Sequence, residues 1–234
     1  MGELTELALA TISQAQNRVE VAGQNLANAA TPAFKRRVAF VELLRNGPIG
    51  GANVPQIAFT QDNRAGKFVE TGNLSDLALS GSGYFALGKD SQTIYSRDGQ
   101  LFVDGDGRLI NSQGYALQLD NGRDLVVATD KFEIGIDGTV TDKGIRLGRI
   151  AVFAPLTTVT SELPLEAGIN GAQFIPVEKM QIVQGAYEAS NVVSGDEMVA
   201  MVEALRRAES GQRVMNVYDD LMGRVITAFG EGAR

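Results

Sequence analysis

Both ends of the chain carry a helical apolar stripe, and a long central section has no such period. Near the N-terminus apolar residues recur at steps of three and four, and the stripe comprises Ile12, Ala15, Val19, Ala22 and Leu26. Near the C-terminus the stripe comprises Met198, Met201, Leu205 and Ala208, nearly continued by Val214, Val217, Leu221 and Val225. Each stripe needs a partner helix to cover it. The partner can be the other end of the chain or the ends of neighbouring chains, so the pattern predicts a protein built to polymerise.

The residue types that are missing narrow the function further. The 234 residues include no Cys and no His, which excludes disulfides, thiolate metal sites and Ser-His-Asp or zinc-histidine catalysis. A net charge of −7 gives no electrostatic case for nucleic acid. No apolar run is long enough to span a bilayer, so we expect no membrane insertion. Glu3 and Glu6 stand where a secretory signal carries positive charge, so if the protein is exported, we expect it to be exported without a cleaved signal peptide.

Breaks in the pattern predict three parts. The first helix runs from Leu4 to Ala27 and stops before Pro32, and the last runs from about Gly195 to Ala228. We expect residues 1–33 and 187–234 to form one helical domain from paired, coiled-coil-like helices. Residues 34–66, with glycines and prolines from Asn46 to Gly51, are expected to be an extended connector with little regular structure.

Residues 67–186 predict a central antiparallel all-β domain, so the fold class is α+β. Short β segments alternate with turn residues such as Asp104-Gly105 and Asn121-Gly122, at a spacing typical of a sandwich or barrel. The candidate strands are 77–79, 84–87, 93–95, 100–103, 108–110, 115–119, 125–127, 132–134 and 150–153. The aromatic residues at core-type strand positions are Tyr84, Phe85, Tyr95 and Phe102.

Three short motifs have ordinary structural explanations. Gly81-Ser82-Gly83-Tyr84-Phe85-Ala86 fits a loose dinucleotide pattern, but strand formers follow it where that site needs a helix. Asp104-Gly105-Asp106-Gly107 opens like a calcium loop but lacks the later oxygen ligands, which favours a β-turn. Lys35-Arg36-Arg37 is either a solvated patch in the connector or a contact with a partner. We therefore expect no cofactor and no metal.

Two other segments need more than a local explanation. Asn25 to Asn28 leads into Thr31-Pro32-Ala33-Phe34-Lys35, an Asn-rich helix end followed by a core-type Phe and a Lys. Near the C-terminus, Ser190-Asn191-Val192 precedes a helix whose start, Ser194 to Glu197, fits a capping box. With Asp76 to Phe85 between them, these segments resemble, in order, the signatures of the flagellar basal-body rod and hook family, the axial proteins of the flagellum. Further matching segments are Tyr95 to Gly99 and Asp106 to Ile110.

The resemblance implies a structural subunit rather than an enzyme. Terminal helices of such proteins pair in an inner layer on assembly, and the β domain lies outside it. The implied partners are copies of itself, other rod proteins and the flagellar type III export apparatus, with the rod in the periplasmic space as location. Ala204 to Ala208 departs from the distal-rod pattern, which favours a proximal rod protein. Ala33 stands where the family has Gly, so a turn that needs positive φ there is expected to be relaxed or shifted.

Two alternatives from other classes stay open at this point. A β-rich adhesin would expose an aromatic face, and an enzyme would need a carboxylate pair in a cleft. If the axial hypothesis holds, the residues that matter line an assembly interface. These are Ile12, Ala15, Val19, Ala22, Asn25, Leu26, Asn28, Phe34, Asn191, Met198, Met201, Leu205, Val214 and Leu221.

Overall fold

The computed structural model describes residues 2–44, 54–90, 92–129, 131–155, 174–177 and 180–231. The chain forms two compact units. The helical unit comprises Met1–Ala27, Ala39–Ala58 and Val193–Arg234, and the β unit comprises Asn28–Val38 and Phe59–Val192. The two terminal helices and the antiparallel sheets of the chain confirm the α+β class.

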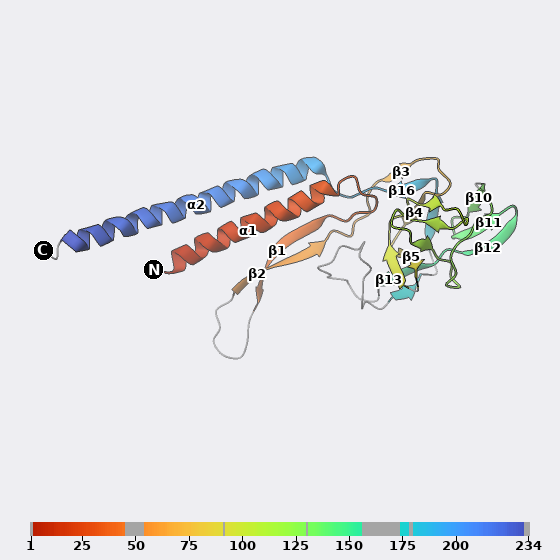
Figure 1. The fold of residues 1–234 in the computed structure, drawn as a ribbon, viewed down its shortest axis with the longest axis horizontal. Coiled ribbons are helices and arrows are strands. Elements are labelled where there is room, and N and C mark those ends of the chain that lie inside the picture. Colours follow the sequence, from red (N-terminus) through yellow and green to blue (C-terminus); the bar gives the residue numbers. More distant parts are fainter. Residues whose placement is uncertain are drawn as a thin grey trace. The chain divides into compact units, whose positions relative to one another are not determined.

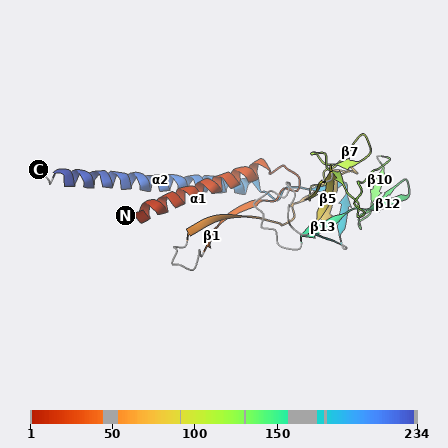
Figure 2. The same cartoon turned by 60° about the horizontal axis from the view of Figure 1, so that its bottom comes forward.

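The helical unit is built on α1 (Gly2–Ala27) and α2 (Ser194–Glu231), close to the predicted bounds. The two helices lie side by side in both views (Figures 1 and 2). Each helix begins and ends within three residues of the bounds that the apolar periodicity predicts. Pro32 follows the end of α1, and Asp196 and Glu197 in the first turn of α2 suit the positive end of its dipole. Their packing as a coiled coil stays a prediction.

Small side chains line the contact between α1 and α2. Ala15 and Ala22 of α1 and Ala204 of α2 are almost fully buried. A Cβ added to Gly211 of α2 would lie 2.8 Å from Cγ1 of Ile12, too close for a carbon contact. The helices therefore approach closely because residues with little or no side chain face each other.

The segment expected to be an irregular connector contains strands. β1 (Arg37–Leu44) and β2 (Val54–Gln61) form a two-stranded sheet. Next to the open end of this pair the Asp62 amide donates to the Arg36 carbonyl at 2.8 Å. The expectation was wrong there because each strand satisfies its backbone groups with the other, which local composition does not reveal. The Asn46–Gly51 stretch lies outside the described residues.

The β unit contains several small antiparallel sheets. A seven-stranded sheet has the order β14-β13-β5-β9-β8-β7, with β6 also paired to β5. A second sheet has the order β10-β11-β12, and two pairs, β15-β4 and β16-β3, complete the unit. The bounds are β3 (Phe68–Glu70), β4 (Leu77–Ser80), β5 (Tyr84–Lys89), β6 (Gln92–Ser96), β7 (Phe102–Val103), β8 (Leu109–Ile110), β9 (Ala116–Leu117), β10 (Phe132–Ile134), β11 (Thr139–Asp142), β12 (Ile145–Arg149), β13 (Val152–Pro155), β14 (Phe174–Pro176), β15 (Gln181–Gln184) and β16 (Ala186–Glu188).

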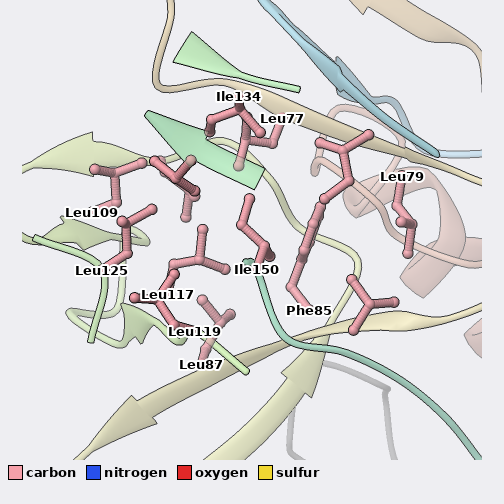
Figure 3. Close-up of a cluster of buried hydrophobic side chains, with 14 of the residues drawn as sticks. Leu77, Leu79, Phe85, Leu87, Leu109, Leu117, Leu119, Leu125, Ile134 and Ile150 are labelled. Carbon is pink, nitrogen blue, oxygen red and sulfur yellow. The ribbon is translucent and has the colours of Figure 1, made fainter. Parts of the chain in front are cut away.

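Leucine and isoleucine side chains from most of these strands form one core. Figure 3 shows Leu77 and Phe85 beside Ile150, with Leu109, Leu117 and Leu125 on the other side of the cluster. Each fully buried side chain of this size contributes roughly 1.5–3 kcal/mol. The predicted core position of Phe85 is therefore confirmed. That of Phe102 is wrong, because β7 is a two-residue edge strand and leaves the ring 49% exposed.

The last strands of the β unit pair with its first ones. β15 runs antiparallel to β4, with Ile182 opposite Leu79, and β16 runs antiparallel to β3, with Glu188 opposite Phe68. Ile182 is 2% exposed and belongs to the core. The unit is consequently closed by residues more than a hundred positions downstream of their partners. Neither β15 nor β16 was expected from the sequence, and the expected strand at 125–127 is reduced to a bridge between Arg108 and Val126.

Candidate assembly site

One buried hydrogen bond joins the two helices. Nδ2 of Asn25 donates to Oε2 of Glu197 at 3.0 Å, and both side chains are almost completely buried. The residues lie 172 positions apart in the chain. Glu197 was expected only to complete a capping box at the start of α2. Its carboxylate does more, because it fixes the register of α2 against the end of α1.

The chain leaves α1 through a tight turn. Hydroxyl Oγ1 of Thr31 donates to Oδ1 of Asn28 at 3.1 Å, and the Thr31 amide donates to the Asn28 carbonyl. Ala33 then takes a φ of 57°, and its amide donates to the Glu188 carbonyl at 2.7 Å. The expectation that this turn relaxes or shifts without glycine was therefore wrong. Phe34, which follows, is buried as predicted.

A buried carboxylate at Glu188 collects two cations. Lys35 donates through Nζ to Oε1 of Glu188, and Nε of Arg97 donates to Oε2 at 2.7 Å. The Gly66 amide adds a bond to Oε1 at 2.8 Å. Gly66 has to be glycine, because an added Cβ would lie 1.9 Å from the Ala189 carbonyl oxygen. Lys35 was expected in a solvated patch or a partner contact. The structure buries its side chain in the β unit, so the solvated alternative was wrong, and the partner contact stays a prediction.

Arg97 also holds a loop in place. Its Nη1 donates to the carbonyls of Gly81 and Gly83, and its Nη2 donates to the carbonyl of Leu79. One guanidinium thus ties the loop after β4 to the carboxylate of β16. We refer to Lys35, Arg97 and Glu188 as the charge cluster.

The charge cluster shifts the pKa values of its members. Burial, the largest influence on Glu188, raises the pKa of this carboxyl, but the Lys35 hydrogen bond and the Arg97 charge outweigh burial and leave the pKa below its ordinary value. Burial lowers the pKa of Lys35. The hydrogen bond and the negative charge of Glu188 raise it again, but only in part, so the pKa stays below its ordinary value. The stability that Glu188 contributes is present above its ordinary pKa of 4.5 and is lost as the pH falls through the lowered value.

Asn191 binds two strand ends with its side-chain amide. Its Oδ1 accepts from the Arg36 amide at 2.7 Å, and its Nδ2 donates to the carbonyls of Asp62 and Arg64 at 2.7 and 3.0 Å. Three of the four bonds that an amide side chain can make are therefore used within the β unit. Arg37 beside it places its guanidinium 5.2 Å from the centre of the Phe59 ring.

The predicted stripe residues fall into two groups. Ala15 and Ala22 are buried, and Ile12, Val19, Leu26 and Met201 are half-buried. The exposed group lies on α2, where large apolar side chains are 45–60% accessible. Its predicted members are Met198, Leu205, Val214, Val217, Leu221 and Val225, and Val199 and Val202, which were not predicted, are exposed beside them.

The buried positions on α2 differ from the stripe read off the sequence. The face toward α1 carries Glu197, Met201, Ala204, Ala208, Gly211, Met215, Tyr218 and Met222, all buried or half-buried. Leu205 and Val214 do not share a face either. Nine residues at about 100° each turn a helix by about two and a half turns, which places these two on opposite flanks of the covered face. The expected near-continuation of the stripe was therefore wrong.

Two remaining motifs lack the geometry of the dinucleotide site and the calcium loop that they resemble in sequence. Gly81-Ser82-Gly83 is followed by β5 and not by a helix, as expected. Oδ1 of Asp104 accepts from the amides of Asp106 and Arg108, which confirms a turn. Within the described ranges, no three acidic side chains group as metal ligands. In the same part of the chain, neither helix has the length and apolar character needed to cross a membrane.

Comparisons with known proteins agree with this arrangement. Residues 78–142 match the profile of the flagellar hook protein FlgE/F/G D1 domain, and residues 183–228 match that of the flagellar basal body rod FlgEFG protein C-terminal region. The flagellar basal-body rod protein FlgG of Bacillus subtilis is 29% identical over 246 residues, which cover 90% of this chain and 93% of that protein. These matches support the flagellar basal-body rod protein family.

Relatives under both rod names match to nearly the same degree. The flagellar basal-body rod protein FlgF of Caulobacter vibrioides is 27% identical over 228 residues, covering 92% of this chain and 93% of that protein. FlgF of Escherichia coli is 28% identical over 240 residues, which cover 93% of this chain and 94% of that protein. What the comparisons show is thus the rod family as a whole, FlgF-like or FlgG-like. The named relatives are rod proteins, and this argues against the adhesin and the enzyme.

Sequence reasoning missed the charge cluster of this rod protein. Glu188 lay next to the Ser190-Asn191-Val192 signature and Arg97 within a matched segment, but no local pattern linked them to Lys35. The one available signal was Lys35 directly after a core-type Phe34, which argues for burial rather than solvation.

Proposed function

We propose that this chain is a structural, non-enzymatic subunit of the bacterial flagellar rod that polymerises through α1 and α2. The observation that carries the proposal is the exposed apolar group on α2, next to a face that α1 already covers. Apolar stripes of this size on a surface helix mark an interaction site. The resulting tube would serve as a drive shaft and as part of the export channel.

The two flanks of α2 supply one contact surface each. Met198, Val202 and Leu205 occupy one flank in its first half, and Val214, Leu221 and Val225 occupy the other flank in its second half. A helix in a closed layer has a neighbour on each side, so two staggered apolar flanks suit a helix inserted between two others. Contacts of this heterologous kind, if they do not close into a ring, build a helical assembly.

Only assembly can cover the exposed apolar group on α2. Each Leu, Ile or Val covered by a neighbour would contribute roughly 1.5–3 kcal/mol. In water alone these side chains stay uncovered, and helices depend mainly on packing rather than propensity for their stability. We therefore infer that the inner layer completes itself as subunits add.

Further details of the assignment rest on the resemblance. The segment Ala204 to Ala208 departs from the distal-rod pattern, so we place the subunit in the proximal rod, as in FlgF. Its partners are then copies of itself and other rod proteins in the periplasmic space. We infer that it reaches them through the flagellar type III export apparatus.

Electron microscopy of basal bodies from cells lacking this chain tests the assignment. We expect a missing or truncated rod, and the point where the rod stops gives the position of the subunit. An intact rod without a hook would move the subunit outward in the axial structure. Normal flagella in such cells would contradict the proposal.

A matched pair of substitutions on α2 tests the interface. Val214→Asp puts a carboxylate on an apolar flank, and Arg213→Asp puts one at the exposed neighbouring position, on the side of the helix opposite the face that α1 covers. We expect Val214→Asp to abolish incorporation and Arg213→Asp to assemble normally. Val19→Asp, on the half-buried face of α1, should also block assembly while leaving the β unit folded. Rods that contain Val214→Asp would refute the flank as an interface.

A further inference from the structure

The β unit has a pocket that the assembly argument does not use. Its volume is about 580 Å³, and residues from five separate segments of the β unit line it. The side chains of Lys35 and Arg97 form part of the wall, together with Asn63, Ser82 and Tyr84. Ser82 is exposed, whereas the charged side chains are almost buried.

The charge cluster beside this pocket is not neutral. Lys35 and Arg97 are 3% and 9% exposed and share the single carboxylate of Glu188, which is fully buried. These three side chains carry one positive charge in excess, because Asp62, whose charge also acts on Lys35, is itself paired with Arg64. This excess lies in a chain whose net charge is −7. An uncompensated buried charge is costly, so a bound anion would be stabilised there.

Among the described residues, Lys35 and Arg97 each also have one N–H group for which no acceptor is found. A guanidinium has five N–H groups, and Arg97 uses four of them, on Glu188, Gly81, Gly83 and Leu79. An ammonium has three, and Lys35 uses two, on Glu188 and the Arg64 carbonyl. Two charge-assisted donors thus remain for a ligand that lies against this wall.

We propose that the pocket binds one carboxylate from an Asp or Glu side chain of a neighbouring copy of this chain. A carboxylate has two oxygens that can accept from the two donors. Its single negative charge neutralises the one excess positive charge of the charge cluster, whereas a phosphate dianion would leave a net negative charge. The chain has 28 acidic against 21 basic residues, so its neighbours offer carboxylates in excess. This inference rests on the proposed rod function, because it takes the ligand from another subunit.

Two substitutions at the pocket rim distinguish the effect of an added negative charge from the effect of a larger side chain. Ser82→Glu supplies the pocket with a carboxylate of its own, and Ser82→Gln adds the same bulk without charge. Because Ser82 is exposed and outside the charge cluster, we expect both variants to fold. The first measurement is an NMR titration of the full chain with sodium acetate, against sodium chloride at equal ionic strength.

We expect acetate to shift the amide signals of Gly81, Gly83 and Tyr84 saturably in the wild type and in Ser82→Gln, but not in Ser82→Glu. Shifts that do not saturate, or that chloride reproduces, would overturn the pocket as a carboxylate site. A saturable response retained in Ser82→Glu would overturn it too.

Complementation then tests the source of the carboxylate. In cells lacking this chain, the wild type and Ser82→Gln should restore rods, and Ser82→Glu should reduce the number of complete rods at least tenfold. Full restoration by Ser82→Glu would overturn the neighbouring copy as the source. Failure of the wild-type chain itself to appear in rods would instead refute the proposed function, which the acetate titration does not involve.

Discussion

Ala33 holds a left-handed backbone conformation at the end of the turn after α1, with φ of 57°. For a residue with a Cβ this conformation costs about 1–2 kcal/mol, and the hydrogen bond from its amide to the Glu188 carbonyl helps to retain it. Replacement by glycine removes that cost, although part of the gain is lost to the greater freedom of the unfolded chain.

We therefore predict that Ala33→Gly raises the free energy of unfolding of the β unit by about 1 kcal/mol. Urea denaturation monitored by tyrosine fluorescence measures this change. Ala65→Gly is the control, because Ala65 is exposed and is not among the residues with positive φ. It should lower the stability. A lower free energy of unfolding in both variants would show that the backbone at Ala33 is not strained.

Removing one charge from the charge cluster should cost a different amount of stability for the anion than for a cation. Glu188→Gln leaves two buried cations without a counter-ion, and we expect it to cost about 3–5 kcal/mol. Lys35→Met leaves Arg97 and Glu188 as a balanced pair and should cost clearly less. Urea midpoints of the two variants at neutral pH give the comparison. Equal losses would mean that Lys35 and Arg97 do not share the carboxylate.

At the scale of the element, two glycines of α2 occupy different surroundings. Gly211 faces α1, where an added Cβ would meet Cγ1 of Ile12 at 2.8 Å, whereas Gly223 has no neighbouring atom within 4 Å of that position. Alanine favours a helix over glycine by about 1 kcal/mol at either site. Only at Gly211 does the methyl group push the helices apart.

We predict that Gly223→Ala raises the helix melting temperature and that Gly211→Ala lowers it or leaves it unchanged. Circular dichroism at the helix band during heating measures both variants against the wild type. A similar gain at both glycines would indicate that α1 and α2 do not approach closely at Gly211.

At the scale of the whole molecule, the β unit depends on its last strands. β15 and β16 pair with β4 and β3, and Ile182 and Glu188 take part in the core and in the charge cluster. A chain ending at Val192 keeps all these contacts and loses only α2. A chain ending at Val177 loses both strands.

The shorter chain should therefore lack a cooperative unfolding transition in the β unit, while the chain ending at Val192 should keep it. Near-ultraviolet circular dichroism and resistance to protease distinguish the two. A folded β unit in the chain ending at Val177 would mean that the closing strands are dispensable.

The sequence by itself determined the local structure and the family of this rod protein. Helical periodicity located α1 and α2 to within a few residues, since each residue's environment repeats every turn. Turn residues located β4, β5, β6 and β10 in the same way. The signature segments, in their order along the chain, suffice for the resemblance to the rod and hook family.

The tertiary structure alone decided which residues meet. Asn25 reaches Glu197 and Lys35 reaches Glu188 across most of the chain, and no local period encodes such pairs. Hydrophobic periodicity also gives most weight to large side chains, whereas α1 and α2 touch where the side chains are smallest, at Ala204 and Gly211. Close approach buries small residues and leaves the large ones on the flanks, and that is a property of the packed pair rather than of either helix.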